Sequence, residues 1–209
     1  MNRVIRYFLG VDVLFLGGWG LIGPIFAVFV LEEIGGTTIF TVGAVSAIYW
    51  VIKSVIQVPI SMYLDKRVGE KDDFYALVFG LALAGFSAMA FLLVDTIAGL
   101  FAVQSLHAVS MAFFTPAWSG MYSRHLDKNR DAFDWSMNST LIGLSHACTA
   151  LVGGGIVAIL GFEAVFILVS ILSFAAAFLM FSIPHLIFPK ASAGTDRSTL
   201  ADHTMFTTK

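Results

Sequence analysis

The feature that most constrains this chain is a series of six long apolar runs separated by short polar loops. The runs occupy residues 7–31, 39–64, 74–94, 97–122, 136–160 and 164–187. A helix crosses a bilayer with about 20 apolar residues, and every run is long enough. Only 12% of the residues are charged, against about 25% in soluble domains. The sequence therefore predicts an all-α integral membrane protein with six spans in the lipid bilayer.

Lysine and arginine lie on one side of the predicted spans. Of the 12 cations, 11 precede the first run, occupy the loops 65–73 and 123–135, or follow residue 188. The loops after the first, third and fifth runs contain none, and the exception, Lys53, lies inside the second run. Because cytoplasmic loops carry an excess of Lys and Arg, we predict that both termini are cytoplasmic.

The two ends of the chain differ in composition. The segment MNRVIR followed by an apolar run resembles the start of a signal peptide. However, the run continues for about 25 residues, contains Asp12 and lacks a small-x-small cleavage site. We interpret it as a retained first helix. After Pro189 the chain is rich in Ser, Thr, Ala and Asp, which is typical of disorder. We predict a six-helix transmembrane domain over 1–187 and a polar, disordered cytoplasmic tail over 188–209.

Helix-breaking residues recur at matching places in the two halves of the predicted domain. Pro24 lies about as deep in the first run as Pro116 does in the fourth. Pro59 lies late in the second run, and the glycines 153–155 lie late in the fifth. Such a pattern is typical of a repeat of inverted topology. The predicted fold is therefore a six-helix bundle built as a 3+3 inverted repeat.

The stretch 61–71, SMYLDKRVGEK, resembles the signature between helices two and three of the major facilitator superfamily. That signature is roughly Gly-x-Leu-Ala-Asp-Arg-x-Gly-Arg-Lys. Asp65 and the cations after it match, whereas Ser61 and Tyr63 replace the first Gly and the Leu, and Gly69 comes one residue late. The resemblance puts a charged hairpin of this family at the second loop.

Two further stretches are similar to the same family. One is Thr-Pro-Ala at 115–117 near the inner end of the fourth run, and the other combines the glycines 153–155 with GFEAVF at 161–166. The resemblance covers about residues 1–187. It implies the fold of one half of a major facilitator transporter, whose usual members have twelve helices in two halves of the same orientation.

The resemblance also implies a function. We expect a secondary transporter of a small solute that works by alternating access as a parallel homodimer, because halves related by an axis along the membrane normal could be two copies of this chain. Two alternatives remain open. The chain could be half of a heterodimeric transporter, or a non-transporting membrane protein that binds a partner or supports assembly.

By this resemblance the charged hairpin takes part in gating. Asp65 would approach the N-terminal end of the fifth helix of the opposite half, near 135–138, where helix dipole and free N–H groups favour a carboxylate. Arg124 and Arg130 are candidate ion-pair partners. The gating candidates are Asp65, Lys66, Arg67, Arg124 and Arg130. The alternative is a solvated loop that only follows the positive-inside rule.

Lys53 lies near the middle of the second run, where a cation costs about 2.5–3.5 kcal/mol on insertion scales. Gln57 lies one turn later and Trp50 one turn earlier, so the three residues form a polar stripe with an aromatic edge. In a two-fold dimer both copies of Lys53 approach the centre, which favours an anionic solute. The alternative is a structural ion pair between Lys53 and Asp12.

Other polar residues lie within the apolar runs. Asp12 is a candidate proton-coupling carboxylate or a structural group, two turns from the cytoplasmic end. The resemblance implies that the first and fourth helices line the cavity, so Gln104 and His107, which share one helix face, are further candidates. His107 either carries a proton or makes a helix–helix hydrogen bond, and His146 and Asn138 leave the same alternatives open.

Enzyme chemistry has little support in the sequence. Six-helix intramembrane serine proteases pair Gly-x-Ser-Gly with a histidine, and this chain offers only Ala-Trp-Ser-Gly at 117–120 and His185, both near the cytoplasmic ends. Cys148 is the one cysteine, so a cysteine metal site is excluded, and there is no phosphate loop and no His-Glu-x-x-His. We predict no enzyme activity, no cofactor, no metal and no nucleic-acid partner.

Overall fold

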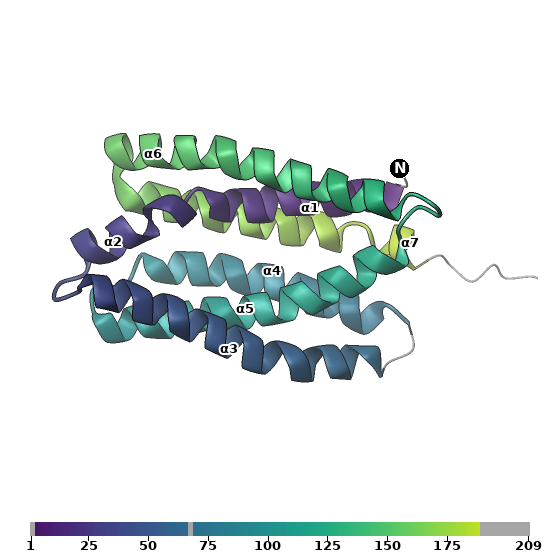
Figure 1. Cartoon of the computed structure of the whole chain (residues 1–209), viewed down its shortest axis with the longest axis horizontal. Helices are drawn as coiled ribbons and strands as arrows, with labels where there is room; N and C mark the ends of the chain where they lie inside the picture. Colours follow the sequence, from purple (N-terminus) through teal and green to yellow (C-terminus); the bar gives the residue numbers. More distant parts are fainter. Residues whose placement is uncertain (1–2, 67–68, 189–209) are drawn as a thin grey trace, which may run out of the picture.

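The computed structural model of the chain describes residues 3–66 and 69–188, and every element in these residues is helical (Figure 1). The elements are α1 (Arg3–Gly20), the 3₁₀ helix η1 (Gly23–Ile25), α2 (Phe26–Glu33), α3 (Ile39–Asp65), α4 (Lys71–Phe91), α5 (Ile97–Arg124), α6 (Asp131–Phe181) and α7 (Pro184–Ile187). When Arg3–Glu33 is taken together, the described residues contain five helices long and apolar enough to cross a membrane. The predicted tail lies almost entirely outside them.

The first predicted span is not one continuous helix. Its α-helical part ends at Gly20, and the 3₁₀ turn Gly23–Ile25 separates it from α2. Pro24 has no N–H for the helix ladder, and in a continuous helix its ring would clash with the carbonyl of Gly20 four residues earlier. Pro59 and Pro116 lie inside α3 and α5, which continue through them. The break at Pro24 is therefore particular to the first span.

The fifth and sixth predicted spans are the two arms of α6. Gly161 separates the arms with φ 81° and ψ 175°, a backbone conformation that is essentially restricted to glycine. Figure 1 shows that the arms, 131–160 and 162–181, run back alongside one another. The second arm ends at Phe181 rather than at the predicted 187, because Pro184 begins the separate short helix α7.

The helices pack in a defined order. α1 packs on α6, while α5 packs on both α3 and α4, and α4 also packs on α6. Close contacts assign the arms: Gly17 faces Ser145 of the first arm, and Ser170 of the second arm donates a hydrogen bond to the Gly85 carbonyl of α4 at 3.0 Å. α3 is the most exposed long helix, since only Thr41, Val45 and Leu64 of its 27 residues are buried.

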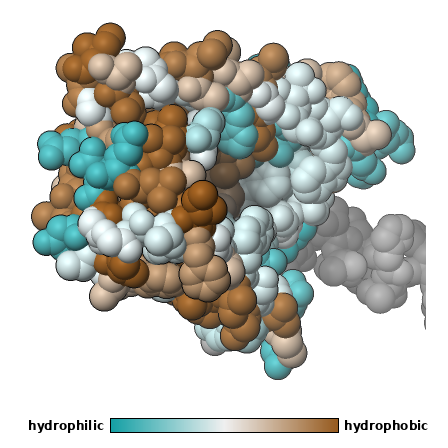
Figure 2. All heavy atoms as spheres, turned by 60° about the vertical axis from the view of Figure 1, so that its left-hand side comes forward, coloured by the Kyte–Doolittle hydropathy of each residue, from teal (hydrophilic) through white to brown (hydrophobic). Residues whose placement is uncertain are grey.

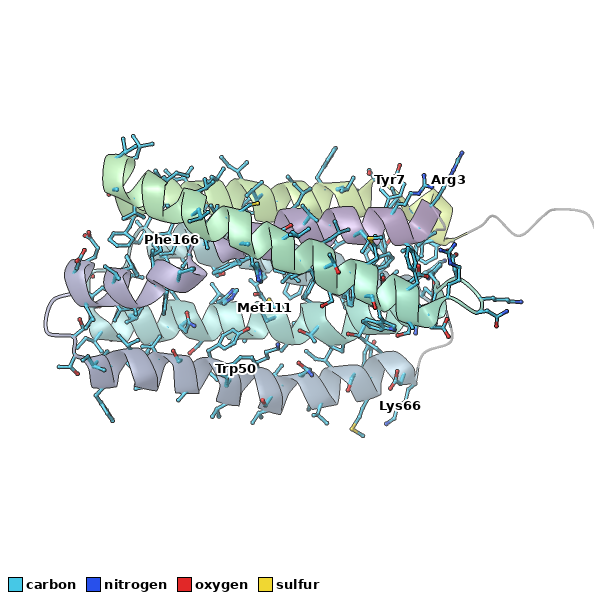
Figure 3. All side chains as sticks on the ribbon, turned by 45° about the horizontal axis from the view of Figure 1, so that its top comes forward. Arg3, Tyr7, Trp50, Lys66, Met111 and Phe166 are labelled. Carbon is cyan, nitrogen blue, oxygen red and sulfur yellow. The ribbon has the colours of Figure 1, made fainter. Side chains whose placement is uncertain are left out.

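The bundle has two chemically different ends. Figure 3 shows Arg3 and Tyr7 of α1 and Lys66 after α3 at one end, which we call the basic end and which also holds Arg124 and Arg130. The opposite end, the acidic end, carries Glu33, Asp95 and Glu163. Each end has its own buried apolar cluster, one around Phe8 and Tyr122 and the other around Phe29 and Phe166.

Threonine side chains shape the loop ends at the acidic end. Thr37 donates hydrogen bonds to the carbonyls of Val30 and Ile34, at 2.6 and 2.9 Å, and so satisfies the end of α2. Thr38 forms a capping box with Thr41 at the start of α3. These bonds fix the turn by which α3 begins, and with it the direction of its polar stripe.

Candidate functional site

A cavity of about 600 Å³ lies between α1, α3, α5 and the first arm of α6, beside the break in the first span. It is lined by Leu16, Trp19, Gly20, Gly23, Pro24, Tyr49, His107, Met111, His146, Ala147 and Ala150. Figure 2, in which the acidic end comes forward, shows a hollow between the helices. Figure 3 shows Met111 between α5 and the helices α1 and α6. The volume of the cavity is in the range of sites that bind small molecules.

His107 lies in the cavity wall at the centre of a stack of rings. Trp19 of α1 stacks on its imidazole with ring centroids 3.7 Å apart and planes 23° apart. Tyr49 of α3 lies nearly parallel to the same ring at 5.4 Å. Nδ1 of His107 also lies 3.4 Å from the Ser87 hydroxyl of α4, which is the helix–helix hydrogen bond anticipated as one alternative. The stack therefore forms one cavity wall from three rings on α1, α3 and α5, and Ser87 of α4 holds the central ring from behind.

Lys53 brings a positive charge to the edge of this cavity. Tyr49, a lining residue, lies one turn earlier on α3, and the charge of Lys53 lies near enough to His107 to act on its ring. Lys53 Nζ is 5.2 Å from the Trp50 ring centroid, within cation–π range. Gln57, one turn later, is half-buried. Of the predicted site residues, His107 lines the cavity, whereas Lys53, Trp50 and Gln57 lie beside it on α3.

The ion pair between Lys53 and Asp12, the alternative considered for Lys53, is not formed in the described part of the chain. Asp12 is instead approached by the side chain of Asn138 on α6. Gln104 lies on the same face of α5 as His107 and is half-buried, but it does not line the cavity. Asp12 and Lys53 therefore belong to different surroundings, and their predicted roles must be tested separately.

His146 connects the first arm of α6 to α1. Its Nε2–H donates a hydrogen bond to the Leu16 carbonyl at 2.9 Å, and both residues line the cavity. The sequence identified His146 only as an ambiguous polar residue in an apolar run. The structure places it in the lining of the same cavity as His107, on the first arm of α6.

Asp12 is almost completely buried, with 1% of its surface exposed. Neither carboxylate oxygen has a hydrogen-bond partner in the described residues, and the same holds for Asn138 Oδ1 and Asp134 Oδ1. Tyr122 donates a hydrogen bond to the Asp134 carbonyl at 2.8 Å. Sequence reasoning missed Asp134, although its spacing of four from Asn138 places both on one face of a helix.

The charged hairpin makes contacts that differ from the expected ones. Arg124, at the end of α5, forms ion pairs with Asp73 and, at 2.9 Å, with Glu70. His125 Nε2 lies 3.5 Å from the other Glu70 oxygen. Within the chain Arg124 pairs with these two acids because Glu70 and Asp73 lie at the start of α4, which packs directly on α5. The candidate pair of Arg124 with Asp65 of a second copy stays a prediction.

The other gating candidates do not form ion pairs in the described residues. Asp65 and Lys66 are exposed, and Asp65 forms no ion pair within residues 3–66 and 69–188. Arg130 lies over the Phe133 ring with its guanidinium carbon 4.6 Å from the ring centroid. Arg67 lies outside the described residues. The exposed position of Asp65 leaves it open to a second chain, and its predicted role in gating stays a prediction.

Comparison with known families decides the identity of this architecture. The family model of the Major Facilitator Superfamily matches residues 9–201, which is nearly the whole chain. The chain belongs to the Major Facilitator Superfamily. No curated protein sequence matches it.

Membership in the Major Facilitator Superfamily makes the chain an integral membrane protein of a transporter family and confirms that it is not an enzyme. The serine-protease alternative is therefore excluded. Ser119 is half-buried near the end of α5, where its carbonyl accepts a hydrogen bond from Ser123. The side chain of His185, the proposed partner of Ser119, lies outside the described residues.

Replacing Arg124 with glutamine should loosen the hairpin at the basic end. Asp73 is buried, so its charge would lose its only ionic partner among the described residues. Because the guanidinium itself is partly exposed and screened, we expect a loss of about 1–2 kcal/mol in the free energy of unfolding. The loss is measured as a lower melting temperature of the purified variant than of the unaltered protein. Arg130→Gln, which removes only a ring contact, should cost less than about 1 kcal/mol, and equal losses would contradict the assignment.

Proposed function

We propose that this chain is a six-span unit of a secondary transporter, that two copies form a parallel two-fold homodimer, and that the dimer carries a small organic anion by alternating access. The observation that carries the proposal is Lys53, a cation inside a membrane-spanning helix at the edge of a cavity lined by rings. A charge in such a position is costly and is retained where it lines a solute pathway.

The six-span topology rests on the fold of α6. If its two arms are the fifth and sixth spans, the number of spans is even and both termini lie on one side. The basic end then faces the cytoplasm by the positive-inside rule, as the lysines and arginines of the loops indicate. The acidic end, with Glu33, Asp95 and Glu163, faces outward.

The packing order supports the proposed 3+3 repeat. In a 3+3 repeat, spans one, two and three correspond to spans four, five and six. The contact of α5 (span four) with α3 (span two) then corresponds to the contact of α1 (span one) with the first arm of α6 (span five). In the same way, the contact of α5 (span four) with α4 (span three) corresponds to the contact of α1 (span one) with the second arm of α6 (span six). Both α1 contacts are present: Gly17 lies against Ser145 of the first arm, and Gly18 lies against Leu172 of the second arm.

The exposed surface of α3 supports a second copy as partner. Trp50 on this helix is 59% exposed, and Lys53 and Gln57 are half-buried. On the first arm of α6, Gly143 has open space around it. A two-fold axis that packs α3 of one copy along this arm of the other would cover both surfaces. It would also bring Asp65 toward the start of the partner's α6.

The cavity suggests the class of solute. Its walls are aromatic and apolar, with Trp19, Tyr49 and Met111, while its polar groups are the two histidines and the nearby ammonium of Lys53. Ring faces and a thioether stack well on flat apolar groups, and a lysine favours a carboxylate. We therefore expect a flat organic monocarboxylate. On a two-fold axis, such a solute binds asymmetrically.

Native mass spectrometry and liposome uptake test the proposal together. The purified chain should give a dimer whose proportion depends on protein concentration. Liposomes that contain it should take up radiolabelled benzoate faster than empty liposomes, and should not take up choline. A persistent monomer without uptake would overturn the homodimer and favour a missing partner chain. A dimer that transports neither compound nor other organic anions would favour the assembly alternative.

A further inference from the structure

A second cavity, of about 490 Å³, lies where α1 meets the two arms of α6. Five of its seven lining residues come from α1, while Leu141 comes from the first arm and Leu179 from the second. Apart from Arg6, every lining residue is aliphatic or glycine, and none is acidic. We call this cavity the α1–α6 groove. The solute pathway proposed above does not use it.

The α1–α6 groove and the ring-lined cavity lie on different faces of the helices they share. Leu141 of the groove and Ala150 of the cavity are nine residues apart on the first arm. Nine residues make about two and a half turns, so the two side chains lie on opposite faces of that arm. Val13, which lines the groove on α1, is 37% exposed. The groove therefore opens to the surroundings of the bundle rather than to the solute cavity.

Arginines border the groove at the basic end. Arg6 lines it and is exposed, and Arg3, one turn earlier on α1, is exposed as well. Figure 3 shows Arg3 near Tyr7 at this end of the bundle. Within residues 3–66 and 69–188, neither arginine forms an ion pair. Both guanidinium groups are therefore available to an anion at this end of the groove.

The length of the groove matches one leaflet of a bilayer. α1 rises by about 12 Å between Arg6 and Leu14, which line its two ends, and one leaflet has about 15 Å of hydrocarbon. Arginines at the end of a spanning helix extend to the bilayer surface. The groove therefore places its cations at the depth of lipid headgroups and its aliphatic walls at the depth of acyl chains.

We propose that the α1–α6 groove binds an anionic phospholipid, with one acyl chain against its aliphatic walls and the phosphate on Arg6 and Arg3. A guanidinium group binds phosphate oxygens through two parallel hydrogen bonds, and basic pockets between spanning helices are typical sites for acidic headgroups. The lining has no acidic residue to receive the ammonium of a zwitterionic headgroup. The charge pattern therefore selects a lipid of net negative charge.

A second copy of the chain fits this groove less well than a lipid does. A parallel two-fold contact would repeat the same patch on both sides. It would set Arg3 and Arg6 of the two copies near one another at the same depth, with no acidic residue in the lining to offset them. The exposed face of α3, by contrast, presents only one cation, Lys53, within the membrane.

Gly10 leaves room for the acyl chain. A Cβ at this position would meet only Leu179 Cδ2, at 3.7 Å, which is an ordinary contact. A methyl group is therefore tolerated there, whereas a longer side chain would extend into the groove. Because the lining comes from α1 and both arms of α6, a bound acyl chain contacts all three segments and stabilises their packing.

Native mass spectrometry of the purified full chain with added lipid tests the site without any transport measurement. Phosphatidylglycerol should bind more tightly than phosphatidylcholine with the same acyl chains, by about fivefold for each arginine, and should raise the melting temperature more. Arg6→Gln should reduce this preference about fivefold. Gly10→Leu should weaken binding of phosphatidylglycerol while both arginines remain. Gly10→Ala and Lys71→Gln, which removes an exposed cation of α4, should leave it unchanged.

Equal binding of the two lipids by the unaltered chain would overturn the site, as would a preference that neither Arg6→Gln nor Gly10→Leu reduces. Displacement of the lipid by inorganic phosphate would show a site for a free anion instead. A shift from dimer to monomer in Gly10→Leu, with lipid binding unchanged, would assign the groove to a second copy. The site does not rest on the transport proposal: a preference for phosphatidylglycerol without benzoate uptake would leave it standing.

Discussion

Lys53→Gln is expected to reduce protein-dependent benzoate uptake about 10- to 100-fold, since a charge-assisted bond contributes about 1.5–3 kcal/mol. The reduction should be large because Lys53 is half-buried inside a membrane-spanning helix, where an interaction with a carboxylate is screened less than in bulk water. Glutamine is one atom shorter than lysine and keeps a polar, hydrogen-bonding end group, but it removes the charge. Initial uptake rates in liposomes at matched protein content measure the effect.

Two variants separate charge from shape at this position. Lys53→Arg keeps the cation near Trp50 and should retain part of the uptake, although a planar guanidinium does not replace an ammonium fully. Lys71→Gln removes an exposed cation at the start of α4 and should leave uptake unchanged. Uptake by Lys53→Gln at the unaltered rate, with the protein folded and dimeric, would show that Lys53 is structural.

The apolar runs predicted the helices well because hydropathy alone decides which segments can satisfy their backbone in a bilayer. They did not predict the break in the first span. Pro24, Pro59 and Pro116 look equivalent in sequence, yet only Pro24 ends its helix. Gly20 and Gly23 flank that position, and glycines weaken a helix. The difference depends on these neighbours and on what packs against the break.

The partners of charged and polar side chains could not be predicted from the sequence. Asp65, Glu70 and Asp73 are acids of one loop region, and Arg124 is more than 50 residues further along the chain. Which acid it contacts depends on how α4 lies against α5. The stack on His107 is similar, because it needs rings from α1 and α3 to meet on α5. Single-span patterns identified Lys53, Asp12 and His107 as unusual but could not pair them.

The glycines 153–155 show how strongly packing separates residues that the sequence makes equal. A Cβ at Gly153 would overlap the carbonyl oxygen of Leu21 and lie 2.9 Å from its carbonyl carbon, whereas Gly154 and Gly155 have nothing within 4 Å. Leu21 belongs to the break between α1 and η1. The first arm of α6 therefore approaches the break directly through Gly153, and a methyl group there would push the two apart.

Gly153→Ala should lower the free energy of unfolding by about 1–3 kcal/mol, the usual cost of forcing a methyl group into a packed contact. Gly154→Ala should leave it unchanged or raise it by up to about 1 kcal/mol, because alanine is the better helix former. Melting temperatures in one detergent compare the two variants. Because Gly20, Gly23 and Pro24 of the break line the cavity, Gly153→Ala should also reduce benzoate uptake under conditions where it remains folded. Equal stability of the two variants would mean that α6 does not contact the break in this way, and the cavity geometry would have to be revised with it.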